Sequence, residues 1–183
     1  MGAVEAFRTI AIAGMNNTPG VAFVSRGDNS GTHAQEKTLW KEAGYNYTTE
    51  ILDSGAWYVD AGKGMGDTLI LADEKKAYTL SDEGTYLSFA NRLALVPIIS
   101  ESTELMNRYS AIAVNPAKYP NTNARGAADF INWLISDEGK QLIGDFGKVE
   151  FGKPLFVPLY PPECSQPPFN CTTCSSGEVN ATA

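Results

Sequence analysis

The chain has 183 residues, of which 43% are hydrophobic and 19% are charged, so it is long enough for one sizeable core or two small lobes and is not disordered overall. Its net charge of −7 argues against a nucleic-acid or acidic-lipid partner, because both reward clustered lysine and arginine and the longest basic cluster is Lys75-Lys76. No run approaches the ~18 to 20 apolar residues that span a bilayer, so we expect no membrane span.

The N-terminal segment predicts a helix and then a strand. Apolar residues recur near helical spacing within residues 3–13, and the turn-forming residues 15–20 end that pattern. The apolar residues 21–25 predict a strand. The first residues lack a basic segment followed by an apolar one, so we expect any export signal to lie upstream of Met1.

A polar run at residues 25–33, with the sequence Ser-Arg-Gly-Asp-Asn-Ser-Gly-Thr-His, separates this strand from a helical pattern over 34–43. Such a junction brings several backbone N–H groups and the positive end of a helix dipole to one spot. Arg26 adds a permanent cation there, and Ser30 and Thr32 add hydroxyls that either cap the helix or donate to a ligand. We therefore predict an anion-binding site that includes Arg26, Ser30, Gly31 and Thr32.

A second glycine-rich loop opens the next helical pattern. Residues 45–49 are turn-rich, and residues 62–66 then read Gly-Lys-Gly-Met-Gly ahead of a helical pattern over 67–74. By itself, such a glycine motif is usually only a turn. A short strand is predicted over 77–80, followed by a turn at 81–85 that leads into another helix.

The second half of the chain predicts two more strands and two helices. Residues 93–99 and 111–114 are apolar and predict strands. Helical patterns cover 125–135 and 138–146, and residues 151–159 are expected to be extended. Strands that alternate with helices in this way favour an α/β sandwich.

The tail from residue 161 is rich in Pro, Cys, Ser and Thr and has the composition of an unpacked stalk. Its three cysteines predict a disulfide and one odd thiol in a secreted tail, because three thiolates with no nearby histidine make a zinc site a poor interpretation. Several Asn-x-Ser/Thr sequons favour an exported eukaryotic protein. The disulfide candidates are Cys164, Cys171 and Cys174, and the glycosylation candidates are Asn16, Asn46, Asn170 and Asn180.

Other chemistries are weaker interpretations of these residues. The alternative for Arg26 is a surface ion pair with Asp28. Gly31-Thr32-His33 resembles the histidine motif of subtilisin-like proteases, but no nucleophile motif accompanies it. The carboxylates are scattered and the single histidine has no ligand partners at useful spacing, so we expect no metal-cation site. We expect neither catalysis nor a cofactor.

The polar run at 25–33 also resembles the Ser-Arg-Gly-Asp-Asp-Ser-Gly-Thr-His signature of the tungstate-binding proteins that serve ABC importers, with Asn29 in place of the second Asp. The resemblance continues in unbroken order over roughly residues 3–159. A collinear series of this kind is far more specific than any single motif. Its further segments are residues 39–44, 62–69, 77–87, 112–116 and 130–134.

This resemblance implies a two-lobed periplasmic-binding-protein type II fold of the α/β class, with one complete α/β lobe plus the C-terminal helices of the other. By analogy, residues 1–20 are a lobe-one remnant helix and crossover, 21–108 form lobe two, 109–160 return to lobe one and 161–183 form the tail. The family's opening strand and loop have no counterpart ahead of Gly2, so we expect the first part of lobe one to be lacking. The last helices should then expose apolar surface that would be covered by the missing segment or by self-association.

The resemblance also implies an oxyanion site made of backbone N–H groups, hydroxyls and Arg26. In the second glycine loop, missing Cβ atoms allow backbone N–H groups to approach the oxyanion oxygens. Glu83 stands where an arginine is usual in the family, a departure that bears on affinity and selectivity. The residues that the resemblance adds to the predicted site are Gly64, Met65, Gly66 and Thr79.

The function implied by the resemblance is extracytoplasmic binding of a tetrahedral oxyanion, tungstate or molybdate, for an ABC permease, with no chemistry on the ligand. The alternative is a secreted eukaryotic protein that retains the binding-protein fold as a structural or interaction module without transport. Measurable oxyanion affinity distinguishes these two functions.

Overall fold

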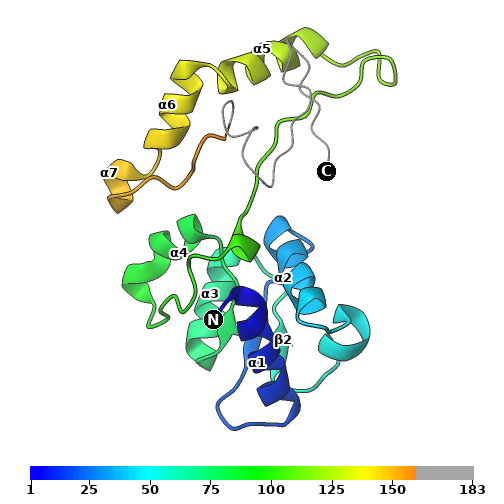
Figure 1. The fold of residues 1–183 in the computed structure, drawn as a ribbon, viewed down its shortest axis with the longest axis vertical. Helices are drawn as coiled ribbons and strands as arrows, with labels where there is room; N and C mark the ends of the chain where they lie inside the picture. The colour runs from blue at the N-terminus through cyan, green and yellow to red at the C-terminus, as the bar shows by residue number, and fades with distance from the viewer. Residues whose placement is uncertain (160–183) are drawn as a thin grey trace. The chain divides into compact units, whose positions relative to one another are not determined.

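The computed structural model describes residues 1–159, which divide into a first unit of residues 1–107 and a second unit whose described part is residues 108–159 (Figure 1). The first unit contains a small parallel sheet with helices, and the described part of the second contains helices but no strand. The predicted disulfide and glycosylation residues Cys164, Cys171, Cys174, Asn170 and Asn180 lie outside the described residues.

A three-stranded parallel sheet is at the centre of the first unit. Strand β1 (Phe23–Ser25) lies between β2 (Tyr58–Asp60) and β3 (Tyr78–Thr79) and pairs with both. All three residues of β1 are buried, as expected for a central parallel strand that is covered on both faces. Because the strands run in the same direction, their carboxyl ends and the loops that follow them meet at one edge of the sheet.

The helices of the first unit begin and end at good capping residues. The Ser30 hydroxyl accepts the His33 N–H at 3.3 Å, and Gly44, at φ +98°, follows the end of that helix. The Asp82 carboxylate accepts the Thr85 N–H at 2.8 Å and caps a shorter helix. The helical segments are α1 (Ala3–Met15), α2 (Gly31–Glu42), η1 (Tyr47–Ile51), α3 (Met65–Lys75), α4 (Glu83–Phe89), η2 (Ala90–Arg92) and η3 (Thr103–Leu105).

Aromatic rings fill the core where α1 and α2 pack on β1. The centroid of the Trp40 ring lies 4.5 Å from that of Phe7 and 5.2 Å from that of Phe23. Gly14 of α1 is packed directly on Trp57, because a Cβ at this position would lie 2.2 Å from the indole ring. Helix α1 is therefore part of the core of the first unit.

The second unit contains α5 (Ala124–Leu134), α6 (Asp137–Asp145) and α7 (Lys148–Phe151). Ser136 caps α6 by accepting the Gly139 N–H at 3.1 Å. Gly139 is also the one buried residue among the described residues of this unit.

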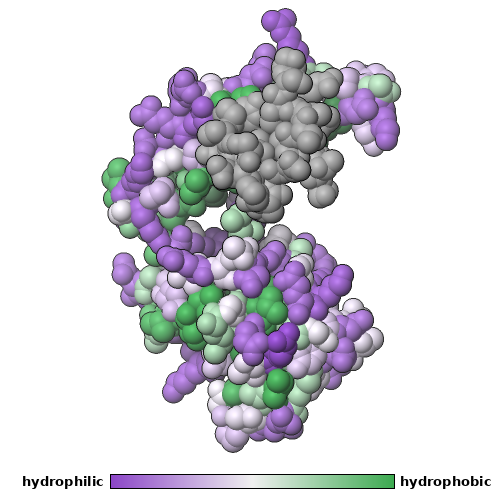
Figure 2. All heavy atoms as spheres, viewed as in Figure 1, coloured by the Kyte–Doolittle hydropathy of each residue, from purple (hydrophilic) through white to green (hydrophobic). Residues whose placement is uncertain are grey.

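Large apolar side chains remain at the surface of the second unit (Figure 2). The exposed fractions are 57% for Phe130 on α5, 59% for Leu142 on α6 and 58% for Phe146 directly after α6. Contiguous exposed apolar surface usually marks a contact with further protein. The structure thus bears out the expectation that the last helices present uncovered apolar surface.

The predicted α/β class is confirmed, as are the helices expected near residues 125–135 and 138–146. The strands predicted over 93–99 and 111–114 are wrong, since neither segment forms a strand. No strand among the described residues pairs with either segment, and an unpaired strand leaves its backbone N–H and C=O groups unsatisfied. The segment expected to be extended over 151–159 begins instead with the last residue of α7 and then forms no strand.

Two of the short elements that were not predicted, β2 and η1, matter for the site. Strand β2 has only three residues, too few to show the alternating pattern by which strands are identified. The turn-rich segment 45–49 leads into the π-helix η1, whose first N–H groups are accepted by the Asn46 side chain. Both elements contribute side chains to the site described below.

The division of the chain into lobes stays a prediction. The first unit ends at residue 107 and contains α1, which packs on β1 and α2 rather than being separate from them. None of the helices in the described part of the chain is long and apolar enough to cross a membrane.

Candidate functional site

Three loops meet at the carboxyl edge of the sheet, and each one leads into the N-terminus of a helix. Residues 26–30, called the anion loop below, connect β1 to α2, residues 61–64 connect β2 to α3, and residues 80–82 connect β3 to α4. The first two loops are joined directly, because the Lys63 N–H donates to the Arg26 carbonyl at 3.1 Å. Helix N-termini that converge in this way provide unpaired N–H groups and positive dipole ends.

The anion loop has a tightly determined backbone. Gly27 has φ +67°, and a Cβ there would lie 1.5 Å from the Asp60 carboxylate of β2, so only glycine fits. Asn29 also lies in the left-handed region, at φ +58°. The Asp28 carboxylate accepts the Ser30 N–H at 3.1 Å and closes the turn before α2.

Arg26 lies beside Asp28, with 2.8 Å between its Nε atom and Asp28 Oδ2. This contact is the ion pair that the sequence left open as an alternative. The Nε–H group is buried and is not aligned with a hydrogen-bond acceptor in the described part of the protein. Burial raises the pKa of Asp28, but hydrogen bonds from Ser30 and the Arg26 charge outweigh that effect, so its pKa is below the ordinary value. Asp28 is therefore ionised at neutral pH and holds the guanidinium at the loop.

The N-terminus of α2 presents two backbone N–H groups that no residue within 1–159 accepts. Ser30 acts as the N-cap, and its oxygen accepts the His33 N–H. The N–H groups of Gly31 and Thr32 have no intrahelical acceptor, and no described residue accepts them. A Cβ at Gly31 would meet nothing within 4 Å, so this side of the helix end faces open space.

The second loop contributes backbone donors rather than side chains. Gly64 has no atom within 4 Å of an added Cβ, and it is the N-cap of α3. The Met65 side chain is buried in the core, so only its N–H group can serve a ligand. An added Cβ at Gly66 would lie 2.5 Å from the Phe89 ring, so this glycine is required by the packing of α3 on α4.

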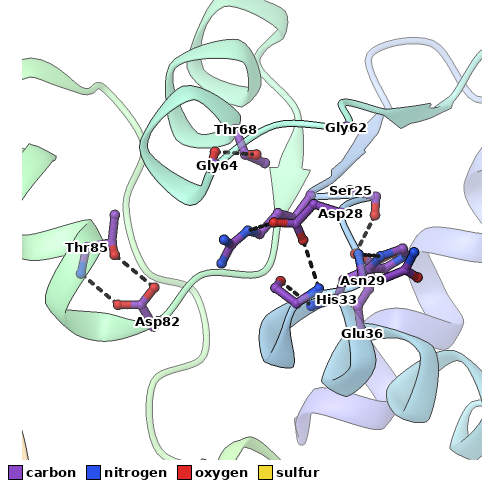
Figure 3. Close-up of polar contacts among 12 residues, drawn as sticks. Ser25, Asp28, Asn29, His33, Glu36, Gly62, Gly64, Thr68, Asp82 and Thr85 are labelled. Atoms are coloured by element: carbon purple, nitrogen blue, oxygen red, sulfur yellow. Dashed lines mark hydrogen bonds and ion pairs between the residues drawn. The ribbon is translucent and has the colours of Figure 1, made fainter.

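Thr79, at the end of β3, already uses its hydroxyl proton. Its Oγ1 atom donates to the Val24 carbonyl of β1 at 2.8 Å, which ties β3 to the central strand. The Thr79 oxygen can therefore accept from a ligand, whereas donation requires breaking this bond. Figure 3 shows Asp82 and Thr85 near the start of α4, where both form the cap of that helix.

A buried polar network lies beneath the anion loop (Figure 3). Glu36 of α2 is 1% exposed and accepts three hydrogen bonds: from Ser25 Oγ at 2.7 Å, from Tyr58 Oη at 2.7 Å and from Trp40 Nε1 at 3.0 Å. The same network reaches His33, which is 3% exposed. A carboxylate that is satisfied in this way rigidifies its surroundings, because any lost donor would leave a buried polar group unpaired.

Burial dominates the titration of this network. It raises the pKa of Glu36 against the opposing effect of its three donors, and it raises the pKa of Tyr58, an effect to which the Glu36 charge adds. Burial also lowers the pKa of His33, with a further contribution from the charge of Lys37, so the neutral imidazole is favoured at pH 7.

Glu36 was not predicted as a site residue, and His33 was considered only in a protease-like motif and as a metal ligand without partners. The available signal was the spacing of Glu36 and Trp40, four residues apart and on the same face as the buried Leu39. A glutamate on the apolar face of a helix needs a buried partner. The described residues hold no group of three or more His, Cys, Asp or Glu side chains that could bind a metal ion.

The two glycosylation candidates among the described residues are both exposed. Asn16 directly follows α1, and Asn46 is the N-cap of η1. Glycosylation at either site stays a prediction.

The family model described as the PBP superfamily domain matches residues 4–138, which is more than half of the chain. The chain therefore belongs to the periplasmic-binding-protein superfamily.

Within this superfamily the chain is similar to tungstate-binding proteins, as the sequence predicted. The curated tungstate-binding protein TupA of Peptoclostridium acidaminophilum is 49% identical over 136 residues, which are 74% of this chain and 46% of that protein. The solved structure of TupA from Desulfovibrio alaskensis G20 is 40% identical and has a TM-score of 0.68, over 86% of this chain and 60% of that one. The solved structure of the tungstate ABC transporter from Geobacter sulfurreducens is 34% identical and has a TM-score of 0.59, over 80% and 57%.

The chain spans about half the length of the curated relatives that it matches. Tungstate binding is named for two of those longer proteins, and the third, from Haloferax volcanii, is named as a putative ABC transporter anion-binding protein.

Proposed function

We propose that this chain is the oxyanion-binding part of an extracytoplasmic solute-binding protein for an ABC importer, and that its ligand is tungstate or molybdate. The observation that carries the proposal is the convergence of Arg26, the start of α2 and the start of α3 at the carboxyl edge of one parallel sheet. The names of the relatives support the ligand and the transport role.

A tetrahedral dianion suits the donors gathered at this edge. Four oxygens that point in different directions can accept from the free N–H groups of Gly31 and Thr32, from hydroxyls and from a guanidinium. Helix N-termini add positive potential through backbone N–H groups, which do not ionise near neutral pH. The proposed ligand-binding residues are Arg26, Ser30, Gly31, Thr32, Gly64, Met65, Gly66 and Thr79.

Binding without chemistry follows from the same donor set. N–H groups and an arginine hold an oxyanion, and a hydroxyl is a nucleophile only when a base activates it. The nearby His33 ring is already paired with the Asn29 N–H and with Tyr47 Oη, so it is not free to act as that base. The relatives are named as binding and transport proteins, which supports the absence of catalysis. An extracytoplasmic location follows by analogy with them.

Replacement of Arg26 tests this function. We expect Arg26→Ala to weaken tungstate binding at least about tenfold, since it removes a charge-assisted contact worth about 1.5 to 3 kcal/mol. The control is Arg8→Ala, which removes the same charge from α1, where Arg8 pairs with Glu5. Isothermal titration with tungstate, molybdate and sulfate measures both variants, and equal affinities for the two would contradict the proposal.

The apolar surface of the second unit is proposed as a contact with lobe-one polypeptide. The exposed rings of Phe130 on α5 and Phe146 after α6 would be covered by such a segment. Adding the first-lobe residues of a tungstate-binding relative as a separate polypeptide should yield a complex by analytical ultracentrifugation. Self-association of this chain instead would identify a second copy as the occupant.

The second candidate function is a secreted eukaryotic module that keeps the fold without transport. The four sequons and the cysteine-containing tail favour it. It predicts a folded protein with no measurable oxyanion affinity, so the titration above distinguishes the two functions.

A further inference from the structure

A chain of hydrogen bonds connects the anion loop to the buried carboxylate below it. The Asn29 N–H donates to His33 Nδ1 at 3.0 Å, and His33 Nε2 lies 2.9 Å from Tyr47 Oη. Tyr47 Oη lies 3.2 Å from Tyr58 Oη, which in turn lies 2.7 Å from Glu36 Oε1. These side chains come from α2, η1 and β2, so three elements are tied to one loop residue.

The two ends of this series of hydrogen bonds determine which atom carries the proton in each contact. A backbone N–H can only donate, so His33 Nδ1 accepts and has no proton, which places the proton of the neutral ring on Nε2. The Tyr47 hydroxyl oxygen accepts a hydrogen bond from this Nε2–H group. Tyr58 has a single hydroxyl proton, and in the shorter contact it donates this proton in a hydrogen bond to Glu36. Tyr58 therefore accepts in its longer contact with Tyr47, and Tyr47 is the donor there. Each link then has one donor and one acceptor.

We propose that His33 is the positioning residue of the anion loop, and that Tyr47 holds it in the tautomer whose Nδ1 atom accepts the Asn29 N–H. Asn29 adopts a left-handed conformation, which few residues other than glycine, asparagine and aspartate adopt, and His33 satisfies its N–H group in that conformation. Its side chain is held from the other side by Lys37 Nζ, which donates to Asn29 Oδ1 at 3.0 Å.

This arrangement also selects the N–H groups that remain for a ligand. The Asn29 N–H is taken by His33 and the Ser30 N–H by Asp28. The next two N–H groups along the chain, those of Gly31 and Thr32, are left unpaired at the start of α2. His33 thus determines which backbone N–H groups of the loop remain for an oxyanion. That the ligand is an oxyanion rests on the proposed function.

The test measures the tautomer and the loop without any ligand. Nitrogen-15 NMR of the full chain at neutral pH should show His33 with an unprotonated Nδ1 and a protonated Nε2. Amide exchange of Asn29 should be about tenfold faster in His33→Phe, which lacks the acceptor. His33→Asn should restore the protection, because its Oδ1 atom replaces Nδ1 as acceptor.

Two tyrosine variants separate the tautomer from packing. Tyr47→Phe keeps the ring but removes the acceptor of the Nε2 proton, so we expect a mixture of His33 tautomers and faster exchange at Asn29. Tyr78→Phe alters an exposed tyrosine of β3 outside the network and should change neither. A protonated Nδ1 in the wild-type protein, or unchanged Asn29 exchange in His33→Phe, would overturn the proposal.

Titration with tungstate distinguishes the failure of this inference from that of the proposed function. We expect His33→Phe to lose about tenfold in affinity and His33→Asn to keep it. Unchanged affinity in His33→Phe, together with lost protection of Asn29, would show that His33 positions the loop but that this loop is not the oxyanion site.

Discussion

The residues of the anion loop are held by partners that leave its charge accessible. Asp28 uses one carboxylate oxygen to close the turn at Ser30 and the other to hold Arg26. An incoming dianion therefore finds the guanidinium already placed, although it must compete with this carboxylate. The positions of Arg26, Ser30 and Thr32 in the loop and at the helix start could be predicted from the sequence because these are local features, whereas their contact with a ligand stays a prediction. Glu36 and His33 could not, because their partners Tyr58 and Tyr47 come from other elements.

At the same scale, the neutral form of His33 predicts a pH dependence of stability. Its pKa is lower in the folded than in the unfolded state, so its contribution is fully present above the ordinary value of 6.5 and is lost as the pH falls through the folded value. Glu36 acts in the opposite direction, because its raised pKa makes the folded state bind a proton more readily.

His33→Asn isolates the histidine effect, since it retains Glu36 and has no titratable ring. Between about pH 7.5 and about pH 5, we expect the free energy of unfolding to fall more steeply in the wild type than in His33→Asn. Urea denaturation at several pH values measures this difference. Parallel curves for the two proteins would show that His33 has the same pKa in both states.

At the scale of elements, the sequence predicts helices better than strands. The helices are recognised from periodicity and caps within the chain, as with Ser30 for α2 and Ser136 for α6. Strands need partners that are distant in sequence, so the apolar segments 93–99 and 111–114 were misassigned while the short β2 was missed. The packing of α1 on Trp57 could not be predicted from the sequence either, because it depends on the absence of a side chain at Gly14.

That contact makes a prediction for α1. Gly14→Ala places a methyl group against the buried indole of Trp57, so we expect a loss of about 1 to 3 kcal/mol in the free energy of unfolding despite the better helix propensity of alanine. Gly31→Ala is the matched control, because its Cβ meets nothing within 4 Å. Urea denaturation compares the two, and an unchanged Gly14→Ala protein would mean that α1 moves freely on Trp57.

At the scale of the whole molecule, the two units differ in how much they bury. Every buried residue in the described part of the chain lies in residues 1–107 except Gly139. Helices with exposed apolar faces and little tertiary packing open at low free energy.

Hydrogen exchange should therefore separate the units. We expect the amides of β1, α2 and α3 to exchange slowly and those of α5 and α6 to exchange within the fastest resolved time, as measured by mass spectrometry of the 183-residue chain. Equal protection of α2 and α6 would show that the apolar faces of the second unit are covered in solution.

We propose above that the carboxyl edge of the sheet binds a tetrahedral oxyanion. Isothermal titration of this chain with tungstate, alongside a form extended upstream by the first lobe of a tungstate-binding relative, tests it most directly. We expect weak, salt-sensitive binding by the chain alone, which spans about half the length of its curated relatives, and tight binding by the extended form. Absence of heat in both forms, with each shown to be folded, would contradict it.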